Sequence, residues 1–182
     1  MEPVERARWE GLYQSHAGQV FAFALRRVGR EDAADVVAET FLVALKRIDQ
    51  VPQEALPWLY AVARNVIGNS RRAAGRREAL QERIRSVASV DRIADPTDEI
   101  DARSDILSPV QLLPEAEREA LMLVAWEDLD VRTAASVMGC SPGTLAVRIH
   151  RGRRRLRKIL STERFDDVSL GTELDKASGG MS

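Results

Sequence analysis

The chain has 182 residues, of which 45% are hydrophobic and 30% charged, and its formal net charge at pH 7 is −1. This is the composition of an ordinary soluble protein with one or two small domains, and its apolar runs stop well short of the ~20 residues that a transmembrane helix needs. The single cysteine, Cys140, excludes an internal disulfide framework and fits a reducing cytoplasm. His16 and His150 are the only histidines, so no zinc-ligand set can be assembled and no metal or cofactor is expected.

The small net charge conceals a strong polarisation along the chain. Seven arginines accompany only two acids between residues 57 and 90, and every charged residue between 145 and 160 is basic. Between residues 91 and 105, by contrast, six acids accompany two arginines. Two basic surfaces with an acidic spacer suggest a polyanion held at two places, although a single run of this kind is equally well explained as a solvated helix face.

Helical periodicity dominates the N-terminal half, and no strand pattern appears. We expect a first helix from about residue 4 to 28, closed by Gly29, and a second from about residue 32 to 48. A loop over residues 49–57 then leads into a third helix that begins at Pro57 and turns basic at Arg71. The apolar stripes of these helices can bury one another in a domain over residues 1–85. The predicted buried set of the second helix is Ala33, Val36, Val37, Phe41, Leu42, Ala44 and Leu45.

The rest of the chain divides by composition into three parts. Residues 86–108 are rich in Asp and short of large apolar residues, which predicts a flexible linker. A second domain over residues 109–160 is expected to begin with a helix that is entered at Pro114 and ends near Ala125. The acidic, polar tail, residues 161–182, favours disorder. The predicted fold is therefore all-α, with two small helical domains joined by a flexible linker.

The most informative stretch, residues 131–158, closes the second domain. Gly139 can adopt the positive φ of a tight turn, while Ser141 is placed to cap the following helix and Pro142 suits its first position. This pattern predicts a helix-turn-helix whose second helix could enter a DNA major groove. One face of that helix is apolar, with Leu145, Ile149, Leu156, Ile159 and Leu160.

The two halves together carry a family pattern. Residues 32–41 read Asp-Ala-Ala-Asp-Val-Val-Ala-Glu-Thr-Phe, and Pro57-Trp58-Leu59 opens the basic helix. Leu113-Pro114-Glu115 precedes the helix-turn-helix. In this order and spacing the motifs resemble the extracytoplasmic-function (ECF, group 4) sigma factors of the sigma-70 family of bacterial RNA polymerase. The resemblance implies sigma region 2 over residues 1–85 and sigma region 4 over residues 109–160, in a protein that is not an enzyme.

The resemblance implies that the protein binds core RNA polymerase and directs promoter-specific transcription initiation. Its acids Asp32, Asp35 and Glu39 would bind the β′ clamp, although surface acids near a helix start are also common without a partner. The −10 element would be read by Arg64, Asn65, Asn69, Arg71 and Arg72, with the loop over residues 49–54 as a pocket for a flipped base. In this region Trp58 fits the core better than a stacking role, and Tyr60 fits either.

The resemblance assigns the second helix of the helix-turn-helix to the −35 element. Arg148 is the best candidate for a bidentate contact to guanine, and the later arginines suit phosphates or the β flap of the polymerase. The residues implied in −35 binding are Ser141, Thr144, Ala146, Val147, Arg148, Arg151 and Arg155.

Other functions and partners stay open. A helix-turn-helix regulator that acts without polymerase would use the same reading helix, and an adaptor could use the basic helices to bind an acidic protein. Family members are often inhibited by an anti-sigma factor, which the sequence neither identifies nor excludes.

Overall fold

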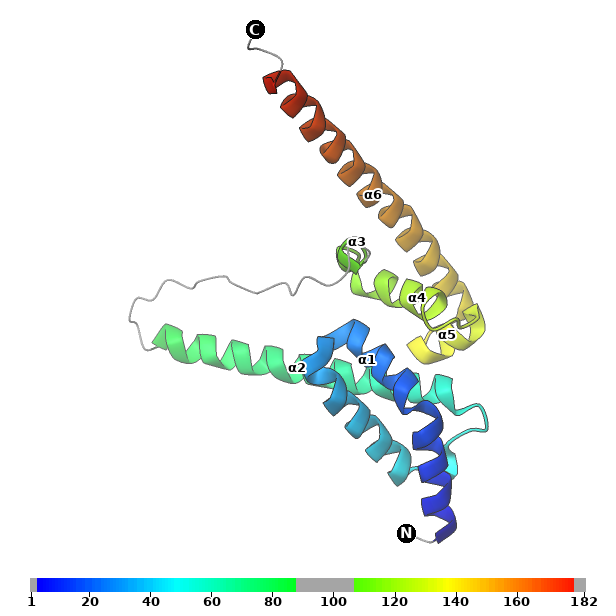
Figure 1. Ribbon diagram of the computed structural model, residues 1–182. Coiled ribbons are helices and arrows are strands. Elements are labelled where there is room, and N and C mark those ends of the chain that lie inside the picture. The colour runs from blue at the N-terminus through cyan, green and yellow to red at the C-terminus, as the bar shows by residue number, and fades with distance from the viewer. Residues whose placement is uncertain (1–2, 88–106, 179–182) are drawn as a thin grey trace. The chain divides into compact units, whose positions relative to one another are not determined.

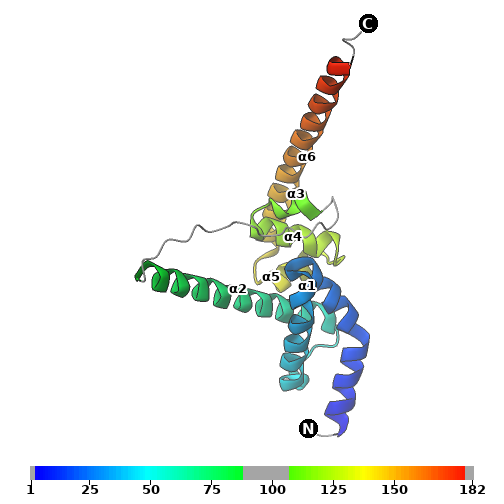
Figure 2. The ribbon, with the colours of Figure 1, turned by 60° about the vertical axis from the view of Figure 1, so that its left-hand side comes forward.

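The structure is a computed structural model in which residues 3–87 and 107–178 are described. All the regular elements of these residues are helices, and they form two compact units (Figures 1 and 2). The first unit holds α1 (Pro3–Lys46), the short 3-10 helix η1 (Ile48–Gln50) and α2 (Ala55–Val87). The second holds α3 (Leu107–Gln111), α4 (Glu115–Ala125), α5 (Val131–Met138) and α6 (Pro142–Ser178). The all-α prediction is confirmed; the predicted linker, residues 86–108, lies almost wholly outside the described residues.

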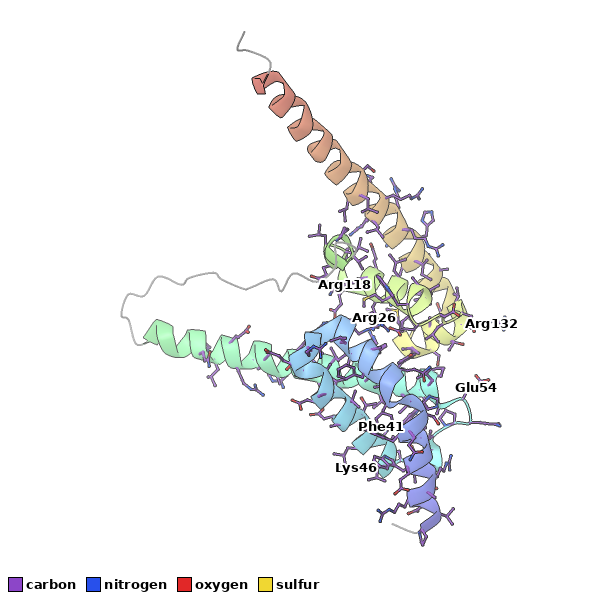
Figure 3. All side chains as sticks on the ribbon, in the orientation of Figure 1. Arg26, Phe41, Lys46, Glu54, Arg118 and Arg132 are labelled. Atoms are coloured by element: carbon purple, nitrogen blue, oxygen red, sulfur yellow. The ribbon has the colours of Figure 1, made fainter. Side chains whose placement is uncertain are left out.

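The long helix α1 is broken at Gly29. This residue has φ 78° and ψ −177°, a combination that is open essentially only to glycine. The two halves of α1 can therefore turn against each other and against α2, with Phe23, Phe41 and Leu59 fully buried among them. Figure 3 shows Phe41 between the halves, where its ring packs edge-on against Tyr13 at 4.9 Å. The predicted pair of helices separated by Gly29 is confirmed.

One predicted core residue of α1 is wrong. Leu42 is 49% exposed, while its neighbour Phe41 is buried. Consecutive helical residues point about 100° apart, so burying Phe41 directs Leu42 away from the core. Further along, α2 begins at Ala55 and not at Pro57, because proline is tolerated in the first turn of a helix. The connecting loop after η1 is thereby reduced to residues 51–54.

The helix-turn-helix of the second unit is confirmed in its turn and in the cap of its second helix, and the structure adds a cap on the first. The Oδ1 atom of Asp130 accepts from the backbone N–H groups of Arg132 at 2.7 Å and Thr133 at 2.9 Å, which caps α5. Gly139 ends that helix at φ 63°. The backbone N–H of Thr144 then donates to Ser141 Oγ at 3.1 Å, so Ser141 caps α6 as predicted.

The C-terminal part of α6 differs from expectation. The helix continues to Ser178, where composition favours a disordered tail from residue 161. Residues 161–178 contain no proline, and the one glycine within them, Gly171, costs a helix only about 1 kcal/mol. Leu160, expected on the apolar face, is 47% exposed because Ile159 takes the inward position beside it.

Candidate nucleic-acid interface

A row of acids lies on the second half of α1. Asp32, Asp35 and Glu39 follow at helical spacing and are all exposed, while Val37 and Phe41 are buried on the opposite side and Val36 is buried at the margin of the row. Leu42 lies one turn after Glu39, on the same exposed side of α1 as the acids. The structure therefore brings the three predicted acids together and adds an exposed apolar side chain. No local sequence signal predicts that Leu42 is exposed, because helical periodicity fits this residue equally well as part of the core.

A second row lies on α2. Asn65, Asn69 and Arg72 are exposed at spacings of four and three residues, and Arg72 Nη2 donates to Asn69 Oδ1 at 2.6 Å. Arg76, four residues further, is exposed on the same side and was not among the predicted residues. The same spacing rule identifies it. We call Asn65, Asn69, Arg72 and Arg76 the amide-arginine row.

Arg64 and Arg71 do not belong to this row. Arg71 Nη2 donates to the carbonyl oxygen of Arg27 at 2.9 Å, and Arg64 is half-buried on the same side of α2 as Arg71. The Arg27 guanidinium carbon stands 3.4 Å from the centre of the Phe23 ring, which in turn stacks on Tyr60 at 4.7 Å. Tyr60 is only 3% exposed, so the structure places it in the core and not on a base-stacking surface. Trp58 is half-buried.

The loop before α2 borders a hollow. Arg8 Nη2 donates to the carbonyl oxygen of Val51 at 2.9 Å and ties this loop to the first half of α1. The hollow between the loop and α1 has a volume of about 430 Å³ and is lined by Leu12, His16 and Gln53, among others. Glu54 is exposed at the far end of the loop (Figure 3).

Only part of the residue set predicted for −35 binding lies on one side of α6, which we call the reading face. Thr144, Val147, Arg148 and Arg151 share one side of α6 at spacings of three, four and seven residues. All are exposed except Arg148, which is half-buried. Ala146 is exposed on a different side of the helix. At the start of α5, Arg132 is exposed and projects from the unit (Figure 3).

The last predicted −35 residue, Arg155, has a partner inside its own unit. Its Nε atom lies 3.4 Å from Glu117 Oε2 on α4. Ser141 is occupied as a helix cap, and Cys140 in the turn is half-buried. Within residues 3–87 and 107–178 no group of three or more His, Cys, Asp or Glu side chains is arranged to hold a metal ion. No helix in the same ranges has the length and apolar character needed to cross a membrane.

Comparison with known proteins identifies both units. Residues 12–77 match the family model for sigma-70 region 2, and residues 105–156 match the model for sigma-70 region 4. The ECF RNA polymerase sigma factor EcfG of Rhodopseudomonas palustris is 30% identical over 162 residues, which cover 87% of this chain and 88% of that protein.

Solved structures agree at the level of the fold. The sigma factor RpoE of Bartonella quintana, solved with the anti-sigma factor NepR, has a TM-score of 0.64 at 24% identity, covering 84% of this chain and 96% of that one. CnrH, solved with the cytosolic domain of CnrY, has a TM-score of 0.59 at 25% identity, covering 85% of this chain and 88% of that one. A helix-turn-helix regulator unrelated to polymerase does not account for region 2. The chain belongs to the sigma-70 family and is an RNA polymerase sigma factor of the ECF group.

Proposed function

We propose that this sigma factor grips its targets with two separate units. The α1–α2 unit, residues 1–85, binds core RNA polymerase and the −10 element, and residues 109–160 bind the −35 element, with residues 86–108 as the linker between them. The role is one of binding and not of catalysis. The observation that supports it is that the two units expose three compact rows of the required chemistry. The first unit has acids and an apolar residue on α1 and amides and arginines on α2, and the second has arginines on the reading face of α6.

The core-binding surface is the acid row with Leu42. Three carboxylates on one exposed side attract a basic partner and steer its approach. We assign that partner to the β′ clamp of the polymerase. Leu42 adds apolar area at the end of the row, and because its side chain is 49% exposed, burying the remainder contributes about 1 kcal/mol. Charge gives orientation here, and Leu42 gives affinity.

Charge reversal tests this surface. The triple variant D32K/D35K/E39K should lose binding to core polymerase and promoter-dependent transcription in vitro, measured by native gel and run-off assay. The matched control is E10K, because Glu10 is an exposed acid in the first half of α1, outside the row. Unchanged core binding by the triple variant contradicts the proposed role of the acid row.

The −10 surface is the amide-arginine row together with the loop at residues 49–54. Unpaired bases need amides or aromatic rings, and their backbone needs basic side chains. We assign Asn65 and Asn69 to bases, and Arg72 and Arg76 to phosphates. N69A should reduce duplex opening, measured by permanganate reactivity of promoter thymines, more than R77A does, since Arg77 is exposed on another side of α2. Equal losses would contradict this assignment.

The −35 surface is the reading face of α6. Arg148 is assigned a bidentate contact to guanine, which discriminates against a wrong base by about 1–3 kcal/mol. In selection from random promoter sequences, R148A holoenzyme should lose the preference at one position of the −35 element. R153A, an exposed arginine off the reading face, should keep all preferences. A preference profile for R148A that equals the wild-type profile contradicts the assignment.

An anti-sigma factor is a further proposed partner. The sigma factor RpoE of Bartonella quintana was solved with the anti-sigma factor NepR, and the shared fold makes a partner of this kind reasonable for this chain. Such a protein should compete with core polymerase for the two units. The test is to add the product of the adjacent gene to the run-off assay, and transcription that continues unchanged contradicts inhibition by that product.

A further inference from the structure

The α3–α6 unit holds one buried carboxylate at the contact between α4 and α6. The side chain of Glu117 is only 10% exposed, and its Oε2 atom accepts no hydrogen bond from the described residues. The Nε atom of Arg155 lies 3.4 Å from that oxygen. A buried charge without a hydrogen-bond partner is costly unless an opposite charge stands close to it, so Arg155 has a task inside the unit.

The two helices also approach each other closely one turn before this pair. A β-carbon added at Gly152 would lie 3.0 Å from Leu121 Cδ1 and 3.3 Å from the carbonyl oxygen of Glu117. Both distances are tighter than nine in ten real Cβ contacts, so a side chain here would have to push Leu121 or the backbone of α4 aside, and the crossing of α4 and α6 favours glycine at this position. Gly152 directly follows Arg151, the last residue of the reading face. The crossing therefore determines how the reading face is presented.

We propose that Arg155 is a positioning residue and not a DNA contact. Its guanidinium balances the buried Glu117 carboxylate, and together with the Gly152 crossing it fixes the direction of α6 against α4. The side chain of Arg155 is 54% exposed, so a phosphate could reach it, and the sequence alone favoured that role. The predicted effect on DNA binding rests on the proposed −35 function, whereas the pairing of Arg155 with Glu117 does not.

The two roles predict opposite effects of neutralising Glu117. If Arg155 positions the helix, then E117Q removes the charge that holds it and weakens DNA binding. If Arg155 binds a phosphate, E117Q removes a competing carboxylate and tightens DNA binding. A phosphate contact also carries a salt signature: each one lost lowers the slope of log affinity against log salt by about 0.9.

The experiment compares E117Q, R155Q and the double variant in the full-length chain, with R154Q as the matched control at an exposed neighbouring arginine. Hydrogen exchange of the α4 and α6 amides reports the coupling without any DNA. We expect both single variants to exchange faster in α4, and the double variant to exchange no faster than the worse single. Additive increases in the exchange rate would contradict the pairing, and this result does not depend on the proposed function.

The second measurement is the affinity of the holoenzyme for a promoter fragment selected with the wild-type protein, at several salt concentrations and at a temperature where every variant is folded. We expect E117Q and R155Q to weaken binding about threefold to fivefold with an unchanged salt slope, roughly the effect of a 1 kcal/mol loss. A tighter E117Q complex, or a slope that falls by about one unit in R155Q, overturns the proposal. Unchanged affinity in both variants overturns it too, because the pair would then be structural only.

Discussion

The guanidinium of Arg71 donates a hydrogen bond to the carbonyl oxygen of Arg27, with 2.9 Å between Nη2 and the oxygen. Arg27 lies two residues before Gly29, so its carbonyl belongs to the C-terminal end of the first half of α1. Helix ends of this kind carry unsatisfied carbonyl groups and partial negative charge, which a cation stabilises. Arg71 on α2 thus stabilises the end of the first half of α1, although the two residues are 44 positions apart in the sequence.

This capping role predicts the effect of substitution at Arg71. R71Q should lower the free energy of unfolding of the α1–α2 unit by about 1 kcal/mol, the usual net contribution of one hydrogen bond, because solvent at the exposed Arg71 weakens the effect of its charge. Urea unfolding can follow the fluorescence of Trp9 and Trp58 in a W126F background, because Trp126 is the only tryptophan of the other unit. R77Q is the control and should change little, because Arg77 is exposed on another side of α2. Equal losses in R71Q and R77Q would attribute the effect to charge and not to the cap.

The break at Gly29 predicts a contrast between two glycines of α1. G29A should destabilise the α1–α2 unit by about 1–3 kcal/mol, because alanine is strained at φ 78° and ψ −177°. G18A should instead stabilise it by about 0.5–1 kcal/mol, since Gly18 is helical and a β-carbon there meets nothing within 4 Å. The same urea titration measures both. A G29A chain as stable as the wild type would mean that α1 can adopt another path.

The close crossing at Gly152 predicts a similar contrast in the second unit. G152A should cost about 1 kcal/mol, because the new methyl group lies 3.0 Å from Leu121 Cδ1 and 3.3 Å from the carbonyl oxygen of Glu117, and the backbone of α4 gives way less easily than a side chain. G143A, in the first turn of α6, meets only Ser141 Oγ at 4.0 Å and should be tolerated. Hydrogen exchange in α4 measures the difference. Protection that is equal in the two variants would show that the crossing yields easily.

The cap of α5 predicts a pH dependence. Hydrogen bonds from the backbone N–H and the hydroxyl of Thr133 hold the pKa of Asp130 below its ordinary value of 3.8. The ionised carboxylate is the form that caps, so the cap is fully present above that value and is lost as the pH falls through the lower pKa of the folded chain. An NMR titration of the Asp130 carboxyl carbon should place its midpoint below 3.8. A midpoint at or above this value would contradict the cap, and D130N should abolish the transition.

Much of the fold could be predicted from local sequence because it depends on local chemistry. Gly29, Gly139, Ser141 and Pro142 act through their own backbone preferences, and the structure uses each of them as predicted. The acid row could be predicted for the same reason, since helical spacing alone places Asp32, Asp35 and Glu39 on one side. Whether these acids bind polymerase stays a prediction.

Local sequence could not supply the contacts between residues far apart in the chain. Arg71 looked like its neighbour Arg72, and only the packing of α2 against α1 distinguishes them, by placing Arg27 within reach of the first. Arg155 looked like Arg154 until the fold brought Glu117 beside it. Leu42 could be exposed or buried on periodicity alone. No local pattern contains this information, because the partner lies elsewhere in the sequence.

The turn at Gly29 has a consequence for how the acid row is aimed. A single pair of backbone dihedral angles sets the direction of all three carboxylates relative to the helix that precedes them. Glycine restricts its own backbone angles less than any other residue, so hydrogen bonds elsewhere must hold the turn in place. Trp9 Nε1 donates to the carbonyl oxygen of Phe41 at 3.0 Å, and Arg71 donates to the carbonyl oxygen of Arg27. The direction of the acid row therefore depends on Trp9 and Arg71, two residues that lie outside the row itself.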